Sequence, residues 1–120
     1  MRQTYAHEAL LDIGEGADSR APGAAITLYL CGSWEHDGPC PLAPHHTNAK
    51  RDGAHLRIRV LFAVEPELEI IVRRRVEEAL SAGRLNSPEG ESTGWRLVHS
   101  GASRPTAGET ERATRLASSP

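Results

Sequence analysis

Alternating apolar and polar positions predict four strands in this chain of 120 residues. The clearest strand covers 55–64, where five apolar side chains share one face. Weaker alternations predict strands over 5–13, 24–31 and 95–99. The segment 32–54 is so rich in proline and glycine that we expect an irregular loop there.

The second face of the clearest strand changes character half-way along. It begins with His55, Arg57 and Arg59, which can face water, and ends with Leu61 and Ala63. The second half of this strand is therefore apolar on both sides. We expect a helix, a neighbouring sheet or another subunit to cover it.

A spacing of three and four between apolar residues predicts the main helix, which begins at Pro66. Proline is tolerated at the first helical position, because its missing N–H would have no partner within the helix there. The apolar stripe runs to Leu80, and Ile70 lies outside it. Gly83 is expected to end the helix as its C-cap.

A shorter helix is predicted near the C-terminus, over about 107–117, because Thr106 and Glu109 have the spacing of a capping box. Its apolar side is thin, so we expect it to form only where it docks, on this domain or on a partner chain. Together, the elements predict one α+β domain over 1–104, followed by a tail over 105–120. The domain would contain a small antiparallel sheet of about four strands covered by the main helix.

Composition and charge restrict the partners that we expect. The net charge is −2 and the pI is about 6.3, so no strong positive field attracts nucleic acid or an anionic membrane surface. No apolar run has the length of a membrane span, and no signal-peptide core follows Met1, which favours the cytoplasm. The single lysine among thirteen arginines indicates the codon usage of a GC-rich, bacterial genome.

Both cysteines and four of the six histidines lie between positions 31 and 55. Thiolate and imidazole groups are the donors that zinc prefers, which makes a zinc site one hypothesis for this region. The candidate ligands are Cys31, His36, Cys40, His45 and His46. Their C-x4-H-x3-C-x4-H-H spacing lacks the paired knuckles of common zinc motifs, so its specificity is weak. One alternative is that Cys31 is a buried strand-end residue and that His45 and His46 are solvated loop residues. Another is a disulfide between the cysteines, which a reducing cytoplasm disfavours.

Acid–base chemistry is a second hypothesis. His36 lies between Glu35 and Asp37, and a carboxylate beside an imidazole can tune it for proton transfer near neutral pH. His55 begins the clearest strand, on the same face as two arginines. We therefore predict His36 and His55 as candidate catalytic residues.

Ligand binding is a third hypothesis. If the strand 24–31 paired with the clearest strand with these faces aligned, one shallow surface would be lined by Tyr29, Cys31, His55, Arg57 and Arg59. Guanidinium groups match carboxylates, so this surface would suit an anionic or peptide ligand. Trp34, in the polar loop, is predicted to fold over the core as a lid or to contact the ligand. The alternative is a solvated sheet face whose arginines reflect codon usage.

No motif typical of nucleotide-binding proteins, metalloproteases or serine hydrolases occurs in the chain. In size and composition the chain is similar to small accessory proteins of GC-rich bacterial biosynthetic clusters, such as the lysinoalanine-forming proteins of lanthipeptide pathways; this likeness covers no motif.

One predicted function is an accessory binding or tailoring protein that holds a peptide or small molecule between a sheet face and the His/Cys/Pro-rich loop, for example in peptide natural-product maturation. The other is a non-catalytic, zinc-stapled domain for protein–protein contact.

Several apolar side chains have no predicted cover within the domain. Leu61, Ala63 and Ile70 belong to this group, and the thin C-terminal helix adds to it. Because a 120-residue domain has few elements to cover such a surface, we predict a homodimer.

Overall fold

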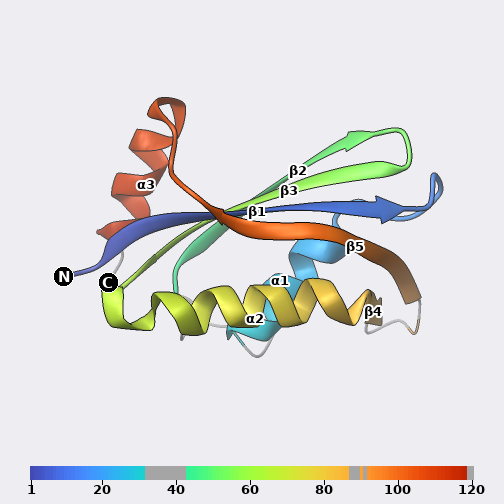
Figure 1. The fold of residues 1–120 in the computed structure, drawn as a ribbon, viewed down its shortest axis with the longest axis horizontal. Coiled ribbons are helices and arrows are strands. Elements are labelled where there is room, and N and C mark those ends of the chain that lie inside the picture. Colours follow the sequence, from blue (N-terminus) through green and yellow to red (C-terminus); the bar gives the residue numbers. More distant parts are fainter. Residues whose placement is uncertain (32–42, 87–89, 91, 119–120) are drawn as a thin grey trace.

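The computed structural model describes residues 1–31, 43–86, 90 and 92–118. Within these residues, five strands form one antiparallel sheet in the order β2-β3-β1-β5-β4 (Figure 1). The elements are β1 Gln3–Ile13, α1 Ala21–Cys31, β2 His45–Asp52, β3 His55–Val64, α2 Glu69–Ala82, β4 Arg84–Asn86, β5 Ser92–Ser103 and α3 Thr110–Ala117. Short 3-10 turns over Pro66–Leu68 and Ala107–Glu109 lead into α2 and α3.

The sheet separates two layers of helices. Helices α1 and α2 cover one face, which we call the inner face, and α3 lies on the opposite, outer face near the start of β1 (Figure 1). The element order, with β1 and β3 in the centre of the sheet, is the split βαβ arrangement of ferredoxin-like folds. The predicted α+β class is thus confirmed. This architecture serves many functions, so the function has to be derived from the site.

The core lies between the inner face and the two helices that cover it. Its largest fully buried side chains are Leu11, Leu56, Ile58, Val60 and Phe62 from the sheet, Pro22, Ile26 and Leu30 from α1, and Val72, Val76 and Leu80 from α2. Trp95 of β5 closes one end, where its indole N–H donates to the Leu80 carbonyl over 2.9 Å. Of the described helices, none is both long and apolar enough to cross a bilayer.

The predicted strand over 24–31 is wrong, because this segment is part of helix α1. The alternation of Ile26, Leu28 and Leu30 suggested a strand. In the structure the buried residues Ala25, Ile26 and Leu30 lie on one side of a helix. Ile26 and Leu30 are four residues apart, which is about one helical turn as well as an even, strand-like spacing.

The loop predicted over 32–54 is also wrong in part, because β2 occupies residues 45–52. This strand carries mostly polar side chains and has no alternation of apolar residues that would reveal it. The hairpin to β3 turns at Gly53, whose φ of 62° is readily adopted only by glycine. The other part of the predicted loop, 32–42, lies outside the described residues.

Helix α2 ends as predicted. Gly83 adopts a left-handed conformation with φ of 69°. A Cβ atom at this position would also lie 2.8 Å from the carbonyl oxygen of Trp95, so both backbone angle and space require glycine. Ile70 is 69% exposed, in agreement with its predicted position off the stripe.

The C-terminal helix docks on its own domain. The Thr106–Glu109 capping box forms as predicted and leads into α3. Helix α3 packs on the outer face against β3 and β1. Leu61 is 3% exposed and Ala63 is fully buried. These two side chains therefore need no second subunit to cover them.

Candidate functional site

The outer face of the sheet brings together polar residues from four strands. Strand register places Lys50, Arg57, Leu10 and His99 side by side across β2, β3, β1 and β5. The neighbouring row towards α3 contains Asn48, Arg59, Glu8 and Gly101, and the row on the other side contains Asp52, His55, Asp12 and Arg96. We refer to these as the Lys50 row, the Arg59 row and the His55 row.

Arg59 fastens α3 to the sheet. Its guanidinium group donates to both carboxylate oxygens of Glu109, at 2.7 Å each, and to the Arg104 carbonyl at 2.6 Å. It also donates to Glu8 and, over 3.1 Å, to the Ser103 hydroxyl. Arginine has five N–H donors, and these contacts use all of them. The predicted ligand contact of Arg59 is thus replaced by contacts within the domain.

The same contacts change the protonation of Glu109. The Arg59 guanidinium, which donates to both of its oxygens, lowers the pKa of the Glu109 carboxyl to about 2. The Thr106 backbone N–H donates to the same carboxylate over 2.8 Å and acts in the same direction. Glu109 therefore carries its charge throughout the neutral range, and the cation of Arg59 is compensated.

The Lys50 row has the opposite character. Lys50 and Arg57 are direct cross-strand neighbours on the outer face. Neither forms an ion pair or a side-chain hydrogen bond with another residue in the described part of the chain. Together with Asn48 and His99 they line a hollow of about 220 Å³ on the open sheet. This hollow presents an amide, an imidazole and two cations that have no ion-pair partner in the described residues, and the paired side chains of Glu8 and Arg59 also line it.

The His55 row adds a carboxylate–imidazole pair. The Nδ1 atom of His55 lies 2.8 Å from the Asp12 carboxylate, and Arg96 pairs with the other oxygen of Asp12. Arg96 above all keeps the pKa of Asp12 below its usual value, so this carboxylate stays charged. Because Nδ1 faces the Asp12 carboxylate, Nε2 is the ring nitrogen left to contact a ligand. His55 is two residues from Arg57 on the same face of β3, about 7 Å along the strand.

The predicted surface of Tyr29, Arg57 and Arg59 does not form. Tyr29 belongs to α1, which covers the inner face, whereas Arg57 and Arg59 lie on the outer face. The arrangement failed because it assumed that residues 24–31 form a strand. Trp34 and the candidate base His36 lie outside the described residues.

Those predicted zinc ligands that the structure describes do not come together around one point. Cys31 is disulfide-bonded, and the other cysteine, Cys40, lies outside the described residues, as does His36. His45 and His46 are consecutive on β2, so their side chains point to opposite faces and cannot reach one ion together. In the described residues, no group of three or more His, Cys, Asp and Glu is placed to hold a metal.

The environments of the two histidines confirm this separation. On the inner side, His45 Nδ1 donates to the Ala43 carbonyl over 3.1 Å, and Nε2 lies 3.0 Å from the Thr27 hydroxyl. On the outer side, His46 lies 3.4 Å from Arg112 of α3. Burial and this arginine lower the pKa of His46, so its ring is neutral at pH 7.

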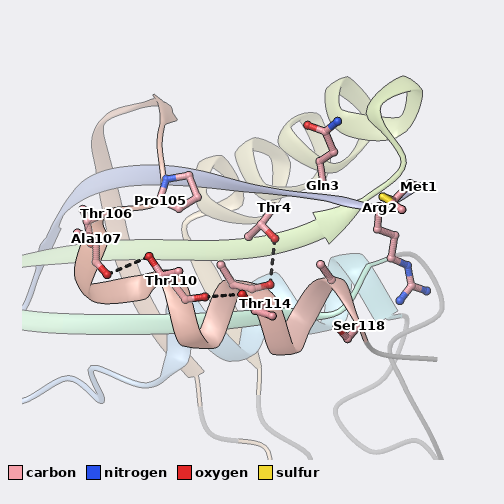
Figure 2. A pocket seen from close by; sticks show the side chains of 12 residues that line it. Met1, Arg2, Gln3, Thr4, Pro105, Thr106, Ala107, Thr110, Thr114 and Ser118 are labelled. Atoms are coloured by element: carbon pink, nitrogen blue, oxygen red, sulfur yellow. Dashed lines mark hydrogen bonds between the residues drawn. The ribbon is translucent and has the colours of Figure 1, made fainter.

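A larger groove of about 590 Å³ lies between the start of β1 and α3 (Figure 2). Three hydroxyl groups on its walls are already bonded to the backbone. Thr4 donates to the Ala113 carbonyl over 3.0 Å, Thr110 to Ala107 over 3.0 Å and Thr114 to Thr110 over 2.9 Å (Figure 2). Arg2, Gln3 and Ser118 also line this groove. The Lys50 row, with two cations that have no ion-pair partner in the described residues, offers the stronger chemistry for an anionic ligand.

One polar cluster was not identified from the sequence. His7 is 3% exposed on the inner face, and burial lowers its pKa. Arg73 lies 3.1 Å from its Nδ1, and Nε2 lies 2.8 Å from Ser100 and 3.1 Å from Glu77. Arginine can only donate, so Nδ1 accepts and Nε2 carries the proton. His7 therefore cannot take a proton from Ser100, and the cluster holds β1, β5 and α2 together. The sequence feature that could have revealed this cluster is a histidine at an inward-facing position of a predicted strand.

No protein-family model matches the chain, and no curated protein matches it significantly.

Proposed function

We propose that the protein is a small accessory binding protein that holds an anionic ligand, a carboxylate-bearing peptide or small molecule, over Lys50 and Arg57. The observation that carries this proposal is the direct opposition of these two cations without a carboxylate partner among the described residues. Like charges directly opposite one another destabilise a sheet. A bound carboxylate would offset this repulsion and match the planar guanidinium group.

The neighbouring rows support this choice of site. Arg59 is compensated by Glu8 and Glu109, and Arg96 by Asp12. Uncompensated positive charge is therefore concentrated in the middle row rather than spread over the face. A uniform excess of arginine from codon usage would not produce this contrast.

The His55–Asp12 pair extends the proposal towards tailoring chemistry. A ligand carboxylate bound at Arg57 would place adjacent groups of the ligand near the Nε2 atom of His55, which could accept a proton from them. Composition favours a GC-rich bacterium as the source, and the maturation of a peptide natural product is one role that fits the proposal. The disulfide at Cys31 argues against the reducing cytoplasm expected from the sequence.

Titration with glutarate, a small dicarboxylate, tests the proposed site. In ¹H–¹⁵N NMR spectra we expect saturable shifts of the Lys50, Arg57 and His99 amides and of the Arg57 side-chain N–H. The double variant Lys50→Gln/Arg57→Gln should bind about tenfold more weakly or worse, because charge-assisted hydrogen bonds are lost.

The matched control removes two cations elsewhere. Arg74→Gln/Arg84→Gln changes the net charge equally, on the exposed surface of α2 and β4, and should leave glutarate binding unchanged. Equal affinity of both double variants at constant ionic strength would contradict the proposal.

A further inference from the structure

Strand β2 forms an open edge of the sheet. Its neighbour within the described residues is β3 alone. The Ala63 N–H donates to the Pro44 carbonyl over 3.0 Å, and hydrogen-bonded pairs alternate along antiparallel strands. Even-numbered residues of β2 therefore direct their backbone groups at β3. Thr47 and Ala49 direct theirs away from the sheet, where an additional strand could pair with them.

A groove of about 480 Å³ accompanies this edge, between β2 and the first turns of α1. Its walls include the small side chains of Ser19, Ala24 and Ala49 and the backbone of Gly23. The hydroxyl oxygen of Thr47, which also lines the groove, is buried and has no hydrogen-bond partner among the described residues. The edge thus combines open backbone groups with space for side chains and an unsatisfied polar atom.

We infer that an extended acidic peptide segment adds to β2 as a further strand along Thr47–Ala49. This inference rests on the proposed function and specifies its ligand class. Alternate side chains of an added strand point to opposite faces. Small side chains would enter the groove beside Ala24, and acidic side chains would lie on the outer face next to Lys50, with Arg57 one strand further.

The accessible edge is short, which favours a peptide over a second copy of this chain. Arg51, two residues beyond Ala49 on the same face, donates to the carbonyls of Gly14 and Ala17 over 2.8 and 3.1 Å. Its side chain therefore crosses from the edge strand to the loop after β1 and occupies the inner side of the edge there. A segment of about five residues fits the remaining length.

The probe is the blocked peptide acetyl-Ala-Glu-Ala-Glu-Ala-amide, added to the full chain. Its addition should shift the Thr47 and Ala49 amides and slow their hydrogen exchange. The variant Ala49→Pro removes an N–H that points away from β3, so the β2–β3 hydrogen bonds remain. We expect it to weaken peptide binding about fivefold or more, which is the effect of losing one backbone hydrogen bond.

Two further variants make this test robust. Ala49→Ser keeps the N–H and should bind the peptide like the unmodified chain. Ala24→Phe fills the groove from α1, leaves the sequence of β2 unchanged and should also prevent binding, with the fold checked by the β2–β3 cross-peaks. If Ala49→Pro and Ala24→Phe both bind the peptide normally, the inference is overturned.

The outcomes separate this inference from the proposed function. Glutarate binding that persists in Ala49→Pro while peptide binding is lost supports both. Glutarate binding with a peptide affinity insensitive to Ala49→Pro overturns the added strand alone. Equal binding of the glutamine analogue of the peptide overturns its acidic specificity. A dimer of the unliganded chain that Ala49→Pro dissociates would show a second copy at the edge, which also overturns the inference.

Discussion

Arg57 and Arg59 lie two residues apart on the same face of β3, yet their surroundings differ completely. Every N–H donor of Arg59 is used, mostly by residues that α3 and the end of β5 bring to it. Arg57 faces Lys50 and has no such partner in the described residues. Identical side chains on one strand therefore contribute differently to the fold: Arg59 holds the C-terminal helix, whereas Arg57 holds no other described residue in place.

The largest expected difference concerns stability. Arg59→Ala should destabilise the protein by about 2 kcal/mol or more, because Glu109 loses its charged partner and α3 loses its attachment. Arg57→Ala should change the free energy of unfolding by less than about 0.5 kcal/mol, as is usual for an exposed side chain. Urea unfolding of both variants measures this contrast. Equal losses would show that the two arginines are not distinguished as described.

The second-largest expected effect is a loss of protection in α3 on acidification, at a pH where the sheet is still folded. The folded-state pKa of Glu109 is about 2, below its value in an unfolded chain, so its stabilising effect is present above about pH 4.5. It is lost as the pH falls towards 2. The protection factors of the α3 amides, which are corrected for the intrinsic pH dependence of exchange, should fall in this window before the sheet unfolds, and Glu109→Gln should abolish this fall. An α3 that stays protected until global unfolding would contradict the attachment by Arg59.

A smaller effect at higher pH comes from the inner face. Burial lowers the pKa of His7, so the unfolded chain binds this proton more readily than the folded one. The stability contributed by the neutral ring is fully present above about pH 6.5 and declines as the pH falls below it. Chemical unfolding between pH 5 and 7 should show this slope, and His7→Gln should flatten it. An unchanged slope would assign the titration to another group.

Local patterns in the sequence were sufficient for elements with a buried face. The alternation in β1 and β3, the stripe of α2 with Gly83 and the Thr106 capping box all appear as predicted. Helix α1 was mistaken for a strand, because Ile26 and Leu30 fit both periods. Strand β2 was missed because an edge strand with polar side chains has no apolar period, although Gly53 marked its turn.

For the same reason, only part of the candidate site could be predicted from the sequence. His55 and Arg57 were assigned to one strand face from their spacing, and the structure places both on the outer face. Lys50 was overlooked, since it lay in a predicted loop. Which cations are compensated depends on strand register and on where α3 docks. These are long-range arrangements that residue spacing does not encode.

The most direct test is a double-mutant cycle between Lys50 and Arg57 on the free energy of unfolding. The single variants Lys50→Gln and Arg57→Gln and their combination are measured with saturating glutarate and with sodium chloride at the same ionic strength. In chloride, we predict an unfavourable coupling of about 0.2–1 kcal/mol between the two cations. In glutarate the coupling should become favourable, because both side chains share the bound anion. A coupling near zero in both solutions would contradict an anion site at this pair.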